Sequence, residues 1–219
     1  MIGEDMIDRW PEFIDVIAAS IAENSGRSCV NASGVWVPRH GRAIAQALAE
    51  KLAKIQPRAA DDPEAAIAPF ADANVAKRMN QMIDGLLSDQ GATDVSAEAG
   101  RGERLAEREG CAYLLPTIVW CESPQHPAAN KEFLFPYASV VETPISTMPE
   151  ILGPTLVLTA ITKDKKFQQR LLEAQHIGRL NFGPIKTIQI VWDQPHEGNL
   201  FDHLYARRAF QSVLEPVGA

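Results

Sequence analysis

The chain has 219 residues, of which 46% are hydrophobic and 22% are charged, and its formal net charge is −7. This balance is typical of a globular protein with one large domain or slightly more. A net negative charge without a run of lysine and arginine disfavours nucleic acid as a partner. The longest apolar runs are far shorter than the ~20 residues that span a bilayer, and the acidic start MIGEDMIDRW lacks a signal-peptide core. We therefore expect a cytoplasmic protein without a membrane segment.

The first half of the chain alternates between helical and extended patterns. Apolar residues at helical spacing predict helices over residues 13–24 (FIDVIAASIAEN), 41–55 (GRAIAQALAEKLAKI) and 74–91 (NVAKRMNQMIDGLLSDQG). SGVWV at residues 33–37 predicts a strand that Pro38 ends. The stretch RAADDPEAAIAPFADA indicates a weakly structured connection, and TDVSAEAGRGERLAEREG a short strand followed by a charged loop.

The second half is richer in strand patterns. Strands are predicted for YLLPTIVWCE, FPYASVVE, PTLVLTAIT, IGRLNFG and IKTIQIVW, and helices for KKFQQRLLEAQ (residues 165–175) and NLFDHLYARRAF. Strands that alternate with helices indicate an α/β fold with a largely parallel sheet flanked by helices.

The cysteines and histidines are not arranged as a disulfide framework or a metal site. Cys29, Cys111 and Cys121 are odd in number and irregularly spaced, which indicates thiols in a reducing compartment. None of the five histidines (His40, His126, His176, His196 and His203) pairs with another ligand at metal-binding spacing. We therefore predict no metal site.

Cys29 differs from the other two cysteines in its surroundings. It lies in ENSGRSCVNASGVWVP, between a helix end and a strand, among small and polar residues that favour exposed, permissive backbone. Such a setting leaves room for a substrate, so Cys29 is the candidate nucleophile. A histidine brought near by folding would make a Cys–His dyad, and this alternative stays open at the sequence level.

SGRSCVNASGVWVP resembles the catalytic-cysteine motif of the aldehyde dehydrogenase superfamily, a G-[QR]-x-C segment between a helix and a strand. Further segments follow in the family's order: YLLPTIVW, KEFLFP, LTAITKD and GRLNFG. The resemblance covers nearly the whole chain but only the C-terminal half of a family member. It implies an NAD(P)-dependent aldehyde dehydrogenase that oxidises an aldehyde through a thiohemiacetal and a thioester on Cys29.

The resemblance also implies a glutamate that binds the nicotinamide ribose of NAD or NADP, within an E-[IV]-F-G-P segment. Glu150 in PEILGP is the closer literal match, but LTAITKD follows it at once, whereas in the family that segment lies well downstream. Glu132 in KEFLFP fits the order of segments, although Leu134 and Phe135 replace the usual Phe and Gly. We assign the ribose contact to Glu132.

The family's cofactor-binding half and its general-base E-L-G-G segment have no counterpart, since 28 residues precede Cys29 and no G-x-G-x-x-G follows a strand. The resemblance implies the end of the missing half at residues 1–24, the catalytic domain at 25–205 and a tail at 206–219. The expected partners are an aldehyde, the missing half and further copies in a homo-oligomer, and the isolated chain is expected to be inactive. Alternatives are an acyl-transferring or reductive relative and a truncated, non-catalytic remnant.

Overall fold

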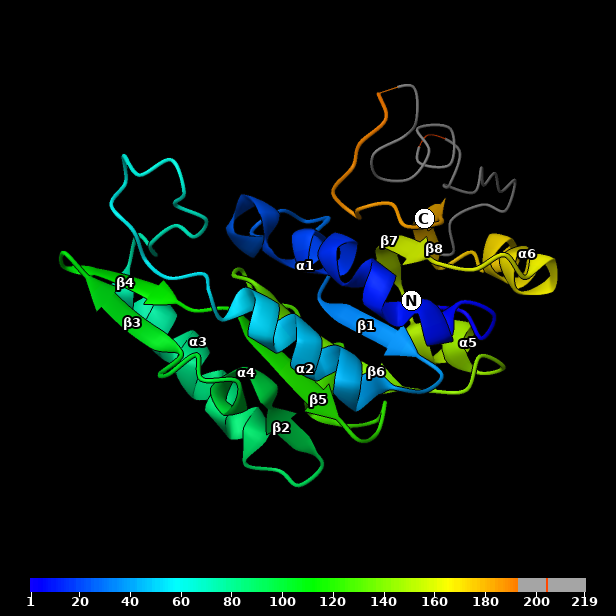
Figure 1. Cartoon of the computed structure of the whole chain (residues 1–219), viewed down its shortest axis with the longest axis horizontal. Helices are drawn as coiled ribbons and strands as arrows, with labels where there is room; N and C mark the ends of the chain where they lie inside the picture. Colours follow the sequence, from blue (N-terminus) through cyan, green and yellow to red (C-terminus); the bar gives the residue numbers. More distant parts are fainter. Residues whose placement is uncertain (193–203, 205–219) are drawn as a thin grey trace, which may run out of the picture. The chain divides into compact units, whose positions relative to one another are not determined.

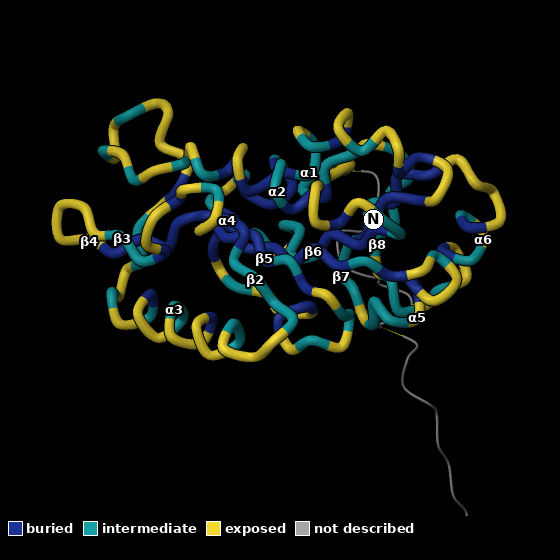
Figure 2. The backbone as a smooth tube through the Cα atoms, turned by 60° about the horizontal axis from the view of Figure 1, so that its bottom comes forward, coloured by how far each residue is buried: buried dark blue, intermediate teal, exposed yellow. Residues whose placement is uncertain are grey.

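A four-stranded sheet organises the larger part of the fold in the computed structural model, which describes residues 1–192 and Leu204. Its strands are, in spatial order, β1 (Gly34–Val37), β6 (Tyr137–Glu142), β5 (Thr117–Cys121) and β2 (Ala92–Asp94). β1, β6 and β5 are parallel, and β2 joins the edge antiparallel to β5. The tube in Figure 2 shows the central strands as buried and the outer side of the helices as exposed.

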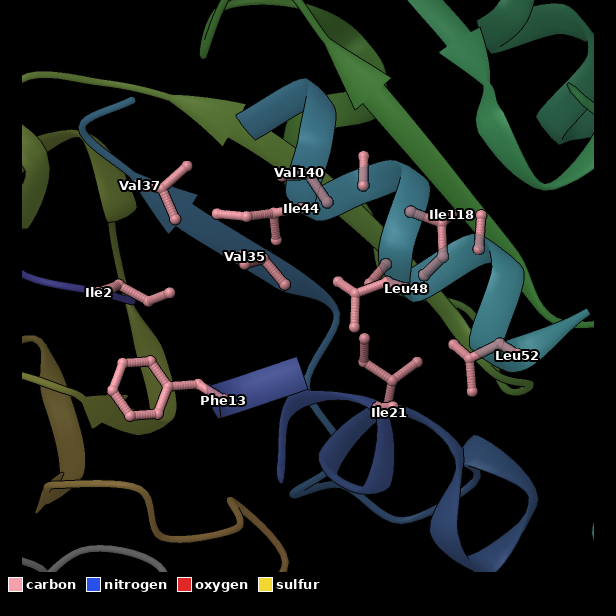
Figure 3. Packing of buried hydrophobic residues seen from close by; sticks show 14 of the residues in the cluster. Ile2, Phe13, Ile21, Val35, Val37, Ile44, Leu48, Leu52, Ile118 and Val140 are labelled. Atoms are coloured by element: carbon pink, nitrogen blue, oxygen red, sulfur yellow. The ribbon is translucent and has the colours of Figure 1, made fainter. Parts of the chain in front are cut away.

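Helices α1 (Ile14–Ala22) and α2 (Gly41–Leu52) cover one face of this sheet. The apolar residues of α2 recur at helical spacing and pack against the side chains of Val35 and Val37 on β1 and Val140 on β6 (Figure 3). These side chains and those of α1 point toward one another and make the main hydrophobic core.

The other face is covered by α3 (Ala73–Leu87), the short helix η3 (Pro127–Asn130) and α5 (Met148–Leu152). Trp36 lies between Val35 and Val37 in β1 and packs on this second face, because successive strand side chains point in opposite directions. Asp72 caps α3 by accepting a hydrogen bond of 2.8 Å from the Asn74 amide. Strands buried on both faces are typical of parallel sheets.

A second sheet pairs β7 (Thr155–Ala160) and β8 (Ile177–Phe182) in parallel, connected by α6 (Lys165–Glu173). A β-hairpin of β3 (Leu105–Arg108) and β4 (Cys111–Leu114) lies apart from both sheets.

The first residues of the chain join the two parallel sheets. Residues 1–3 run extended between β1 and β7 (Figure 1): the Ile2 amide donates to the Trp36 carbonyl at 3.1 Å, and the Gly3 amide donates to the Ile161 carbonyl at 2.9 Å. Ile2 and Ile161 form an isolated parallel bridge. All elements named here belong to one compact unit, Met1–Gln189.

The α/β class with a largely parallel sheet is confirmed, with three local corrections. YLLPTIVWCE is split at Pro116 into β4 and β5, and the expected loop after β2 contains α4 (Val95–Glu98), capped by Asp94, and β3. IKTIQIVW is not a strand, since its main chain bonds to side chains: the Ile185 carbonyl accepts from Thr159 and the Thr187 amide donates to Ser20. Apart from Leu204, the predicted helix NLFDHLYARRAF lies outside the described residues.

Candidate functional site around Cys29

The chain reverses sharply between α1 and β1, and this reversal places the Cys29 loop. Helix η2 (Glu23–Gly26) follows α1, and residues 24–26 all have φ in the left-handed region, between 55° and 64°. A Cβ atom on Gly26 would lie 2.4 Å from the Pro136 nitrogen and 2.5 Å from the Phe135 carbonyl carbon. Only glycine allows this contact, which brings the Cys29 loop against the end of the KEFLFP segment.

Asn31 holds the loop in shape. Its side-chain oxygen accepts from the Ser28 amide at 2.8 Å, and its Nδ2 donates to the carbonyls of Ser20 at 2.9 Å and Glu23 at 3.0 Å. The Asn31 amide donates to the Ser28 carbonyl at 3.0 Å, which closes a turn around Cys29. One amide side chain therefore fixes the cysteine turn to the end of α1. The sequence offered a weak signal for this role, an asparagine two residues after the cysteine.

Arg27, adjacent to this turn, is directed elsewhere. Its guanidinium donates to the carbonyls of Ala68 and Pro69 at 2.8 and 3.0 Å and lies 4.5 Å from the centre of the Phe70 ring. It anchors the connection before α3 to the Cys29 loop. Arg27 is not among the residues that line the Cys29 cavity, which is described next.

Cys29 and Glu132 line the same cavity, which has a volume of about 450 Å³. Cys29, Lys131 and Glu132 are exposed and form the rim, whereas Val35 and Trp36 form part of the buried floor. The volume lies within the range of small-molecule sites. The two residues assigned from the sequence, 103 positions apart along the chain, are thus brought together.

Glu132 carries the only carboxylate among the described residues that line this cavity. Glu150, the competing candidate, lies on α5 outside the lining, and its carboxylate pairs with Arg170 at 3.0 Å. Glu23, close to Cys29 in sequence, pairs with Lys186 at 2.7 Å. Within the described part of the chain, the wall of the Cys29 cavity therefore offers one carboxylate to a bound molecule.

The described histidines do not support a Cys–His dyad. No histidine is among the residues that line the cavity within the part of the chain described here. His40 contacts Asp8 at 3.1 Å, and His126 accepts from the Ala128 amide at 3.1 Å. His196 and His203 lie outside the described residues.

The other two cysteines differ from each other in exposure. Cys121 is fully buried in β5, and burial raises the pKa of its thiol to about 12. Cys111 is exposed at the start of β4, opposite Arg108 in the hairpin. Neither residue lines the Cys29 cavity.

A family model described as the aldehyde dehydrogenase family matches residues 4–152, which include both Cys29 and Glu132. The chain belongs to the aldehyde dehydrogenase family. No match was found among curated proteins. Within the described residues, no helix is both long and apolar enough to cross a membrane.

Solved structures, aldehyde dehydrogenases among them, share the fold of this chain at low sequence identity. PnpE from Pseudomonas sp. WBC-3 has a TM-score of 0.72 and 18% identity, over 90% of this chain and 40% of its own. The NAD⁺ complex of the aldehyde dehydrogenase from Bacillus cereus has a TM-score of 0.69 and 19% identity, over 86% of this chain and 37% of its own. Succinic semialdehyde dehydrogenase from Streptococcus pyogenes in complex with NADP⁺ has a TM-score of 0.68 and 17% identity, over 84% of this chain and 40% of its own. The chain therefore spans about two fifths of the length of these structures.

We predict that Cys29 is the first cysteine to be alkylated in the folded protein. The cavity can hold a small reagent beside its thiol, whereas Cys121 is buried and almost wholly protonated at neutral pH. Cys111 is exposed but lies on an open hairpin surface. Mass-spectrometric mapping after brief treatment with substoichiometric iodoacetamide should find Cys29 labelled before both others. Urea-denatured protein is the control, in which the three rates should converge; earlier labelling of Cys111 in folded protein would contradict the prediction.

Proposed function

We propose that this chain is the catalytic-domain part of an NAD(P)-dependent aldehyde dehydrogenase and that Cys29 is its nucleophile. The supporting observation is that Cys29 and Glu132 line one cavity, although they come from different segments of the chain. Family membership supports an oxidoreductase that acts on an aldehyde.

In this proposal the thiolate of Cys29 attacks the aldehyde carbon and forms a thiohemiacetal. The developing oxyanion needs a donor such as the main-chain N–H of Cys29, and Asn31 holds the turn in which Cys29 lies. When bound, a nicotinamide cofactor supplies the hydride acceptor that lets the thiohemiacetal become a thioester on Cys29. Water then releases the acid and regenerates the thiol.

Glu132 is the residue that would hold the cofactor. Its carboxylate is exposed at the rim of the cavity that Cys29 also lines, a position open to a ribose from solvent. A carboxylate accepts hydrogen bonds from vicinal hydroxyls, so its chemistry fits the ribose contact. The family's structures include both NAD⁺ and NADP⁺ complexes, so the proposed cofactor is NAD or NADP.

The pyrophosphate cradle and the general base are proposed to come from outside this chain. No G-x-G-x-x-G follows a strand in the sequence, and the only carboxylate in the described cavity wall is the one assigned to the ribose. We propose residues 25–205 as the catalytic domain, 1–24 as the end of the cofactor-binding half and 206–219 as a tail, in a cytoplasmic homo-oligomer.

The single carboxylate in the described cavity wall favours a second candidate, an acyl-transferring or reductive relative. Transfer of the acyl group from Cys29 to another thiol needs no general base for water, and the described cavity wall offers no second carboxylate. Both candidates use the same cysteine and the same thioester.

Acyl transfer to Cys29 can be tested without a cofactor. With p-nitrophenyl acetate, the folded chain should release p-nitrophenol and carry one acetyl group on the Cys29 peptide, as read by mass spectrometry. Cys29→Ser should lose this labelling, and Cys111→Ser is the matched control that should keep it. Acetylation spread equally over Cys29 and Cys111 would argue for the non-catalytic remnant instead.

A further inference from the structure

The Asn31 side chain is bonded to the main chain on both sides of the Cys29 turn. Its oxygen accepts from the Ser28 amide at 2.8 Å, and its nitrogen donates to the carbonyls of Ser20 and Glu23 at 2.9 and 3.0 Å. An amide nitrogen has two N–H groups, so both are used on main-chain carbonyls. These N–H groups are therefore not available to a bound substrate, and Asn31 affects a reaction at Cys29 through the turn that it holds.

The carbonyls that Asn31 binds lie where α1 ends and η2 begins. α1 ends at Ala22, and the last carbonyl groups of a helix have no partner within it. The Ser20 carbonyl accepts a second hydrogen bond from the Ala32 amide at 2.9 Å. The chain on both sides of Cys29 is thus fixed to a helix whose buried side chains belong to the main hydrophobic core.

Residues 186 and 187, which follow the second sheet, are bonded to the same end of α1. The hydroxyl of Ser20, a buried residue, accepts from the Thr187 amide at 3.1 Å. The Lys186 ammonium pairs with the Glu23 carboxylate at 2.7 Å. Ser20 and Glu23 are also the two residues whose carbonyls hold Asn31. The segment after β8 is therefore linked to the Cys29 turn through these two residues.

We propose that Asn31 is a positioning residue for Cys29 and that Ser20 supports it by joining the end of α1 to Thr187. The proposal rests on the proposed function, in which Cys29 is the nucleophile. Attack on a carbonyl requires the sulfur and a donor for the oxyanion in one fixed arrangement. Because the Asn31 hydrogen bonds fix the main chain from residue 28 to residue 31, they set the directions of the Cys29 thiol and N–H together.

Two reagents separate the positioning of the thiol from its accessibility. With p-nitrophenyl acetate, the Cys29 sulfur bonds to the carbonyl carbon, an oxyanion forms, and the bond from that carbon to p-nitrophenolate then breaks. With iodoacetamide, the sulfur displaces iodide from carbon, and no oxyanion forms. In both reactions the thiol proton goes to solvent. Acetylation therefore depends on the arrangement of the turn, whereas alkylation depends on access and on the thiolate fraction.

Asn31→Ala should slow acetylation of Cys29 in the full chain by about tenfold or more, while alkylation by iodoacetamide changes by less than about threefold. Both rates are measured by mass spectrometry of the Cys29 peptide over time, at a temperature at which circular dichroism shows each variant to be folded. Asn80→Ala is the matched control, because Asn80 is also half-buried and bonded to another segment, accepting from Arg104 at 3.0 Å. It should leave both rates unchanged.

Ser20→Ala is a smaller change, which removes the acceptor of the Thr187 amide but keeps the carbonyl that Asn31 binds. It should slow acetylation by less than Asn31→Ala does and leave alkylation unchanged, and it keeps the test decisive if Asn31→Ala does not fold.

The outcomes distinguish the two levels of the proposal. Unchanged acetylation in the folded Asn31→Ala variant, or equal falls in both reactions, would overturn the positioning role of Asn31. Unchanged acetylation in Ser20→Ala would overturn the support from Ser20. Absence of acetylation at Cys29 in the unaltered chain would instead contradict the proposed function.

Discussion

Gly26→Ala should destabilise the protein by roughly 2 to 5 kcal/mol, from left-handed strain and overpacking together. The φ of Gly26 is +64°, and the added Cβ would meet the main chain of Phe135 and Pro136 within 2.5 Å. Main-chain atoms cannot rotate away as a side-chain end can, so the two segments must separate. For a chain of this size the expected fall in Tm is roughly 5 to 15 °C, measurable by thermal or urea denaturation.

Gly100→Ala is the matched control, because Gly100 has φ +84° and a Cβ atom added there would meet no other atom within 4 Å. Gly100→Ala should lower the free energy of unfolding by roughly 1 to 2 kcal/mol, from left-handed strain alone. The difference between the two variants isolates the contact between the Cys29 loop and the KEFLFP segment. Equal destabilisation would mean that this contact does not hold the two segments together.

Local sequence patterns predicted most of the helices and strands, because the spacing of their apolar residues matches the faces that are buried against the sheet. The helix α2 ends three residues before its predicted limit, and β1 begins one residue late, but both were found from periodicity alone. IKTIQIVW is the exception: its β-branched residues favour a strand, yet the Ile185 carbonyl accepts from Thr159 and the Thr187 amide donates to Ser20 instead of to a neighbouring strand.

The candidate site was predictable where one short segment carries the signal and not where distant segments meet. Cys29 lies in a loop whose composition alone marks it, and Glu132 was placed by the order of segments. The role of Asn31 depends on carbonyls that helix α1 presents, and the joining of the two parallel sheets depends on the bonds of residues 1–3 to Trp36 and Ile161. Such features require the fold, because no local pattern specifies which main-chain groups will face each other.

Glu132→Gln should slow hydride transfer by roughly 10- to 150-fold in an enzyme that combines this chain with a cofactor-binding partner, because charge-assisted hydrogen bonds contribute about 1.5 to 3 kcal/mol. Glutamine keeps the size of the side chain at the rim of the cavity but weakens its acceptance of the ribose hydroxyls. Single-turnover kinetics should show the loss in the hydride step and in cofactor affinity, while Cys29 alkylation by iodoacetamide stays unchanged.

Glu150→Gln is the control for that experiment, because Glu150 forms an exposed ion pair with Arg170 outside the cavity lining. An exposed ion pair contributes little to stability, so this variant should keep its free energy of unfolding within about 1 kcal/mol. Its hydride-transfer rate should be unchanged. A larger kinetic defect at Glu150 than at Glu132 would reverse the assignment of the ribose contact. Equal, small effects at both positions would mean that neither carboxylate holds the cofactor.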